Sequence, residues 1–83
     1  MARVLFFGKL SDLAGARERN VMLPSRTHTV SDLIDTIGED DTVLSAALKE
    51  SSVRVIINEK MADSGTAVSD RDEVAFLPPV SGG

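Results

Sequence analysis

The chain has 83 residues, of which 42% are hydrophobic and 27% charged, so it suffices for one small domain with a modest core. Cysteine is absent, which excludes disulfides and thiolate metal sites, and the formal net charge of -4 disfavours binding to nucleic acid. Nothing resembles a signal peptide or reaches the length of a membrane span, so we expect a cytoplasmic protein that binds neither nucleic acid nor membrane.

Residues 3–8 predict a strand whose apolar side chains point to both faces of a sheet. Val4 and Phe6 share one face, and Leu5 and Phe7 share the other. A strand that is apolar on both faces belongs in the centre of a sheet.

Two further elements are expected before the main helix. Leu10 and Leu13 have the spacing of one helical turn, which Gly15 is placed to end. A second strand is predicted around Arg19 to Leu23, and Pro24 closes it.

The pattern after residue 28 predicts the main helix. Thr29 and Asp32 have the spacing of a capping box, so the helix begins at Val30, and Gly38 is placed to end it. Its apolar residues recur with helical spacing and form one stripe, made of Val30, Leu33, Ile34 and Ile37.

The second half of the chain predicts one short helix, over 42–48, and three strands, over 54–58, 60–62 and 73–77. The short helix would bring Val43, Ala47 and Leu48 near one another, with acidic residues at its positive end. The last strand stops at two prolines, which remove successive backbone donors.

These elements predict an α+β fold. The first and last strands can pair in the centre of a mixed sheet of about five strands packed on one main helix, which is a β-grasp arrangement. We expect the β-grasp domain to span residues 1–79 and a flexible C-terminal Gly-Gly tail to span 80–83. A ferredoxin-like fold that lacks a helix uses the same elements and is the alternative.

Signals for catalysis or metal binding are weak. His28 is the only histidine and stands in the loop 25–29, so we interpret it as a solvated side chain. The acidic clusters 39–41 and 70–73 lack the alternating carboxylates of a calcium loop, and we interpret them as helix-start and turn carboxylates. We therefore predict no metal and no cofactor bound by this chain.

The C-terminal residues carry the most informative pattern. The prolines at 78 and 79 hold the exit from the last strand extended, and Gly82 and Gly83 allow the backbone to pass through a narrow channel. Pro79 to Gly83 spans roughly 17 Å when extended, enough to reach into the active site of another protein. A terminal carboxylate is ionised at neutral pH, so it must be activated, as by adenylation, before it reacts.

The sequence resembles the small subunit of molybdopterin synthase, a sulfur carrier with the ubiquitin-like β-grasp fold. The similarity covers residues 4–7, Leu13-Ala14-Gly15, the helix 30–37 and the strand 55–58, and it is most specific over the last twelve residues, 72–83.

This resemblance implies that an E1-like adenylating enzyme uses ATP and Mg²⁺ to adenylate Gly83, which then becomes a thiocarboxylate with sulfur from a donor protein. The chain would donate that sulfur to cyclic pyranopterin monophosphate, in molybdenum cofactor biosynthesis. The large subunit of molybdopterin synthase would supply the catalytic side chains and form a heterotetramer with this chain, which would itself be a non-catalytic subunit.

The resemblance also implies which residues meet these partners. The tail that threads into the large subunit would consist of Pro78, Pro79, Val80, Ser81 and Gly82. The apolar interface with the large subunit would consist of Phe7, Met61 and Leu77; for Phe7 and Leu77, packing in the core is the alternative.

Other functions share this terminal chemistry. The chain could be a sulfur carrier for thiamine or transfer-RNA thiolation, a ubiquitin-like modifier of lysines, or an interaction module with an inert tail. One departure from the family pattern stands out, because Asp70-Arg71-Asp72 replaces the usual Asp-Gly-Asp turn. A positive φ at Arg71 would cost about 1 kcal/mol.

Overall fold

The computed structural model describes residues 1–25 and 27–79 of the chain. Within this part there are five strands: β1 (Ala2–Phe6), β2 (Glu18–Val21), β3 (Arg54–Ile57), β4 (Lys60–Ala62) and β5 (Glu73–Leu77). The same residues form three helices: α1 (Lys9–Ala14), α2 (Val30–Gly38) and α3 (Thr42–Leu48). None of these described helices has the length and apolarity needed to span a membrane.

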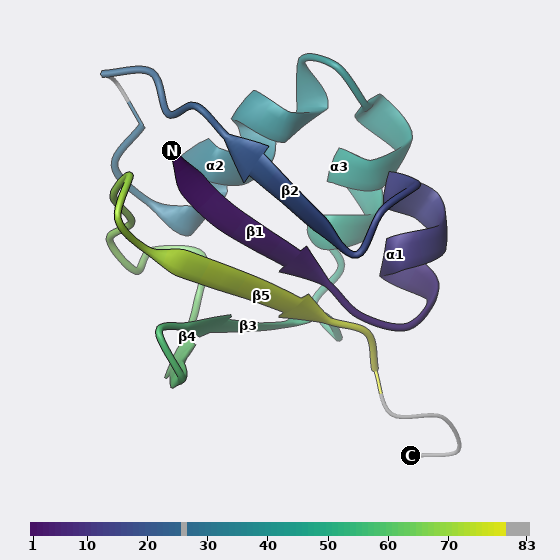
Figure 1. The fold of residues 1–83 in the computed structure, drawn as a ribbon. Coiled ribbons are helices and arrows are strands. Elements are labelled where there is room, and N and C mark those ends of the chain that lie inside the picture. The colour runs from purple at the N-terminus through teal and green to yellow at the C-terminus, as the bar shows by residue number, and fades with distance from the viewer. Residues whose placement is uncertain (26, 80–83) are drawn as a thin grey trace.

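The strands lie in the order β2-β1-β5-β3-β4 (Figure 1). β1 and β5 pair in parallel in the centre, and the outer strands pair antiparallel with them and with each other. The main helix α2 lies in the connection from β2 to β3. This is the ubiquitin-like β-grasp arrangement, so the predicted fold class is confirmed and the ferredoxin-like alternative does not hold.

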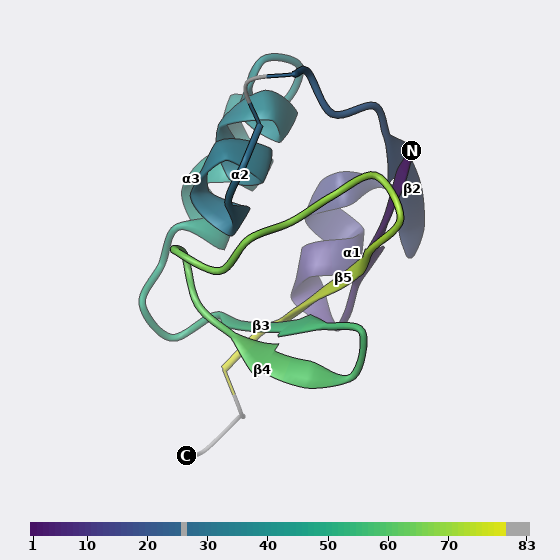
Figure 2. The ribbon, with the colours of Figure 1, turned by 90° about the vertical axis from the view of Figure 1, so that its left-hand side faces the viewer.

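The core lies between the helices and the face of the sheet that curves around them (Figure 2). The helix-side residues of the central strands are buried: Val4, Phe6, Val74 and Phe76. The predicted α2 stripe is buried as well, with each of its four residues at most 4% exposed. The rings of Phe6 and Phe76 stack with their centroids 6.1 Å apart. This contact links β1 to β5 and is also part of the core.

α2 begins where the capping box predicted. The backbone N–H of His28 donates to the Asp32 carboxylate (2.9 Å), as does that of Thr29 (3.0 Å), while the N–H of Asp32 donates to the Thr29 hydroxyl (3.2 Å). The two bonds that the carboxylate accepts, led by the one from His28, hold the pKa of Asp32 below its usual value. The His28 residue is exposed, in agreement with its interpretation as a loop residue.

The short elements differ in detail from their predictions. β2 begins one residue earlier and ends two residues earlier than the predicted strand. In α3 the buried residues are Leu44, Ser45 and Leu48, whereas Val43 is 66% exposed, so Val43 does not join Leu48 in the core. Asp41 caps α3 by accepting from the N–H of Leu44 (3.0 Å), and the helix then turns Leu44 toward the core.

Gly38 allows α2 and α3 to approach closely. A Cβ added at Gly38 would lie 2.8 Å from the Ser45 hydroxyl oxygen and 3.0 Å from the Ser45 Cβ. The Ser45 hydroxyl in turn donates to the Ile34 carbonyl (3.3 Å), so it is held in place inside the core. The sequence indicated Gly38 as a helix end, but the structure adds this second reason for glycine.

We predict that Gly38→Ala lowers the free energy of unfolding by about 1–3 kcal/mol, because the added methyl group overpacks the α2–α3 contact. Gly65→Ala is the matched control, since a Cβ there meets Asp63 Oδ1 at an ordinary 3.5 Å. The control should change stability by less than about 0.5 kcal/mol. Urea denaturation of both variants measures the effect, and equal losses would contradict this account of the contact.

Candidate functional site

The face of the sheet turned away from the helices carries an apolar surface that we call the outer patch. The strand register forms it: Leu5 lies beside Ala75, and Ile56 lies between Ala75 and Met61. One apolar row therefore crosses four strands, from β1 to β4. With the two neighbouring residues at the strand ends, the outer patch consists of Leu5, Phe7, Ile56, Met61, Ala75 and Leu77.

The three predicted interface residues all belong to the outer patch. Phe7 is 47% exposed and Met61 is 65% exposed, while Leu77 is half-buried. The N–H of Phe7 donates to the Phe76 carbonyl (3.1 Å), which continues the central pairing and places Phe7 beside Leu77. Neither Phe7 nor Leu77 is part of the buried core, so the core-packing alternative was wrong for both. That a partner binds these residues stays a prediction.

The tail begins at this same end of the sheet, directly after β5. Pro78 is half-buried and Pro79 is exposed. Gly8 has a φ of 54°, so glycine permits the turn after β1. A Cβ added at Gly8 would lie 2.9 Å from Pro78 Cγ, so glycine also permits Pro78 to pack closely against this turn. The other predicted tail residues lie outside the described part of the chain: Val80, Ser81, Gly82 and Gly83.

Asn58 fixes the hairpin that carries Met61, and sequence reasoning missed it. Its side-chain amide donates to Asp72 Oδ1 (2.8 Å), and its amide oxygen accepts from the N–H of Glu73 (2.9 Å). Asn58 and Glu59 have φ values of 49° and 71°, which form the tight turn from β3 into β4. The strand predicted over 54–58 included Asn58, whereas β3 ends at Ile57. An asparagine two residues before the next strand was the available signal for the turn, since asparagine tolerates this backbone region.

Asp72 closes the turn that precedes β5. Its second carboxylate oxygen accepts from the N–H of Ser69 (2.8 Å), and the bond from Asn58 is the main cause that holds the pKa of Asp72 below its usual value. Among the described residues other than glycine, only Asn58 and Glu59 have positive φ, so the expected strain at Arg71 was wrong. The Asp72 side chain stabilises this turn without a glycine-like backbone at Arg71.

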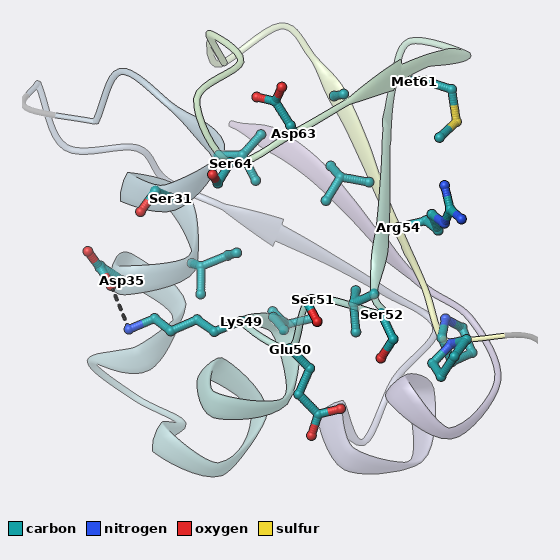
Figure 3. A pocket seen from close by; sticks show the side chains of 18 residues that line it. Ser31, Asp35, Lys49, Glu50, Ser51, Ser52, Arg54, Met61, Asp63 and Ser64 are labelled. Carbon is teal, nitrogen blue, oxygen red and sulfur yellow. Dashed lines mark ion pairs between the residues drawn. The ribbon is translucent and has the colours of Figure 1, made fainter.

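A groove of about 940 Å³ lies between the two helices α2 and α3 and the hairpin β3–β4, and the two prolines of the tail border it. Figure 3 shows its rim, where the Lys49 ammonium pairs with Asp35 (3.1 Å) while Arg54 and Met61 project from the hairpin on the other side. In residues 1–25 and 27–79, no three His, Asp or Glu side chains are grouped so that they could hold a metal ion. Met61, Pro78 and Pro79 line this groove, and every described residue that was predicted for function lies in the outer patch or at the start of the tail.

Comparison with known proteins adds to this geometry. The model of the ThiS family matches residues 4–83. The chain belongs to the ThiS family. It is 30% identical to the molybdopterin synthase sulfur carrier subunit of Haemophilus influenzae, over 100% of both chains, so the predicted family is confirmed.

Solved structures show the same fold for this ThiS-family chain. The crystal structure of SAMP1 from Haloferax volcanii has a TM-score of 0.82 at 30% identity, and covers 99% of this chain and 98% of that chain. The solution structure of the small archaeal modifier protein 1 from Methanosarcina acetivorans has a TM-score of 0.78 at 26% identity, with 99% and 95% covered.

The hydrogen bonds of Asp72 predict how the stability of this ThiS-family chain depends on pH. A carboxyl whose folded-state pKa is depressed stabilises the fold above its unfolded pKa of about 3.9, and this contribution is lost as the pH falls through the folded pKa. Asp72→Asn should therefore lower the free energy of unfolding by about 1 kcal/mol at neutral pH, with a smaller difference from wild type below about pH 3.

Asp70→Asn is the control for this prediction, because Asp70 lies in the same turn and makes no hydrogen bond or ion pair with the described residues. It should leave stability nearly unchanged at both pH values. Urea denaturation in neutral and acidic buffer provides the measurement. A loss for Asp72→Asn that is equally large at both pH values would show that its charge is not the cause.

Proposed function

We propose that this chain is the sulfur-carrier subunit of a molybdopterin synthase, with the sulfur held as a thiocarboxylate on Gly83. The observation that carries the proposal is the course of β5, which runs through the centre of the sheet, contributes Leu77 to the outer patch and continues into Pro78-Pro79 and the Gly-Gly end. Membership of the ThiS family and a full-length relative named as a sulfur carrier subunit support it.

The chemistry takes place on the terminal carboxylate. An E1-like adenylating enzyme holds ATP and Mg²⁺, a carboxylate oxygen of Gly83 attacks the α-phosphate, and pyrophosphate leaves. The terminal sulfur of a persulfide on a donor protein then attacks the carbonyl carbon, and AMP leaves, which forms an acyl disulfide. A thiol attacks the donor-side sulfur of this disulfide, so that the S–S bond to the acyl sulfur breaks, a disulfide forms on the donor side and the thiocarboxylate stays on Gly83. The resulting thiocarboxylate passes its sulfur to cyclic pyranopterin monophosphate in a large subunit, which supplies the catalytic side chains and completes a heterotetramer.

The described residues of this chain position the tail for these reactions. The outer patch binds the partner protein, and the prolines direct the chain away from the end of β5. The remaining residues, 80–83, reach roughly 13 Å farther when extended, at about 3.3 Å per residue. The chain thus brings its terminus to a reaction centre that lies inside another protein.

Mass spectrometry tests the terminal chemistry. After incubation with the adenylating enzyme of the same organism, ATP, Mg²⁺ and a sulfur donor, the mass of the chain should rise by the difference between a sulfur and an oxygen atom, with the change located at Gly83. A chain that lacks Gly82 and Gly83 should remain unmodified while its circular dichroism spectrum is unchanged. An unmodified wild-type terminus, under conditions that convert an established carrier, would refute the proposal.

A second prediction concerns the outer patch. Met61→Asp should weaken binding to the large subunit by at least about tenfold, because it places a charge in the apolar outer patch. Met22→Asp is a matched control, since Met22 is 69% exposed and lies outside the outer patch. Calorimetric titration with the large subunit compares the two variants. Equal weakening by both would show that the outer patch is not the docking surface.

Modification of proteins is a second candidate function, favoured by the likeness to the small archaeal modifier protein 1. In that case a lysine amine attacks the adenylated carbonyl, or an intermediate derived from it, and forms an isopeptide bond. Arg71 is the last basic residue of the chain, so trypsin would leave residues 72–83 on the modified lysine. Detection of this branched peptide in cells would support modification. Loss of molybdoenzyme activity on gene deletion would support the first function over carriage for thiamine or transfer-RNA thiolation.

A further inference from the structure

The side of the sheet on which β1 and β5 end, and where the tail begins, carries three basic residues, although the chain as a whole has a net charge of -4. β1 and β5 end on this side and β2 and β3 begin there, as the registers and Figure 1 show. Lys9 follows the end of β1, Arg17 precedes β2, and Arg54 is the first residue of β3. We call these three residues the basic edge.

The basic edge forms no ion pair with the acidic side chains of residues 1–25 and 27–79. All three of its residues are exposed, and none of their side chains forms an ion pair or hydrogen bond with the described residues. Asp12 follows Lys9 by three residues on α1 without pairing with it. The positive charge at this edge is therefore available to another molecule.

Arg3 shows the opposite arrangement on the same sheet. Its guanidinium is held by Glu18 (2.9 Å) and Glu73 (3.0 Å), and the hydrogen bond to Glu18 is the main cause that raises the pKa of Arg3. Arg3 and Arg54 thus both belong to the outer side of the sheet, but of the two only Arg3 is paired with a side chain among the described residues. The contrast separates a structural arginine from one that is free to bind a partner.

Arg54 joins the basic edge to the outer patch. It lies opposite Leu77 in the β3–β5 register and two residues before Ile56, so it faces the same side of the sheet. Figure 3 shows Arg54 and Met61 on the same side of the hairpin, away from the Lys49–Asp35 ion pair. The apolar and cationic side chains therefore form one continuous surface beside the start of the tail.

The length of the tail decides what the basic edge can contact. An extended segment 80–83 carries the terminus roughly 13 Å beyond Pro79, which exceeds the Debye length of about 8 Å at physiological ionic strength. The basic edge therefore lies too far from the reacting phosphate groups to contact them. A protein surface around the entrance of a channel that receives the tail would lie within its reach, and aspartate and glutamate would be its chemical complements there.

We propose that the basic edge, Lys9, Arg17 and Arg54, binds acidic side chains of the adenylating enzyme around the entrance through which the tail passes. This inference rests on the proposed function and deepens it. The adenylating enzyme is the partner chosen because sulfur transfer and protein modification both require the activation of Gly83. A carrier that must visit several proteins in turn also gains from charge pairs that raise the rate of association.

The association rate constant of the full-length chain with the adenylating enzyme of the same organism tests this proposal. At low ionic strength Arg54→Glu should reduce that rate constant roughly tenfold, and the difference from wild type should disappear at high salt. The KM for the carrier in ATP–pyrophosphate exchange should rise, while kcat at saturating carrier stays unchanged. Arg54→Lys should retain most of the wild-type association rate.

Arg71→Glu is the matched control, because it makes the same change of charge in the turn before β5, at the opposite edge of the sheet. If it slows association as much as Arg54→Glu does, or if reversal of all three basic-edge charges has no effect, the inference is overturned. Thiocarboxylation of the wild type would then still support the proposed function. If Arg54→Glu alone slows binding while the wild type is never thiocarboxylated, the basic edge stands and the proposed function fails.

Discussion

The parallel pairing of β1 with β5 is the contact on which the rest of the structure depends. It joins segments 70 positions apart in the chain, as the ion pair between Arg3 and Glu73 marks, and the stacked rings of Phe6 and Phe76 secure it on the core side. Parallel neighbours need a long crossover connection, and here the whole chain from α1 to β4 provides it. Because the two strands run in the same direction, their C-terminal ends lie side by side on the same side of the sheet. The turn after β1 and the start of the tail are neighbours for this reason.

That side of the sheet combines features that no single segment contains. The outer patch supplies apolar side chains beside the tail, and the close approach of Gly8 and Pro78 determines where the tail starts. The basic edge adds charged side chains that have no partner in residues 1–25 and 27–79. Exposed apolar side chains gathered in one place are characteristic of surfaces that bind other proteins. The polar bonds of Asn58 anchor the turn between β3 and β4 to the start of β5, and the pairing of β4 with β3 brings Met61 into the patch.

Much of the fold could be predicted because its elements have strong local signals. The α2 capping box, the helical spacing of its apolar residues and the alternation in β1 are all properties of neighbouring residues, and each was found in the structure. The failures occurred where local patterns were weak. Val43 and Leu44 are adjacent apolar residues, and only packing against α2 decides which one is buried. A positive φ was expected at Arg71 because the family pattern has glycine there, but Arg71 has no positive φ and a side-chain bond of Asp72 closes that turn.

The sequence by itself determined the order and type of the elements, the central place of the first strand and the proline exit followed by two glycines. These follow from periodicity and backbone chemistry, which act over a few residues. The tertiary structure alone decided that Phe7, Met61 and Leu77 share one surface and that Gly38 and Gly8 are needed for close contacts. It also decided that Arg3 is paired, while Arg54 has no side-chain partner in the part of the chain that the structure describes. Such relations depend on strand register and direction, which bring together residues that are distant in the chain.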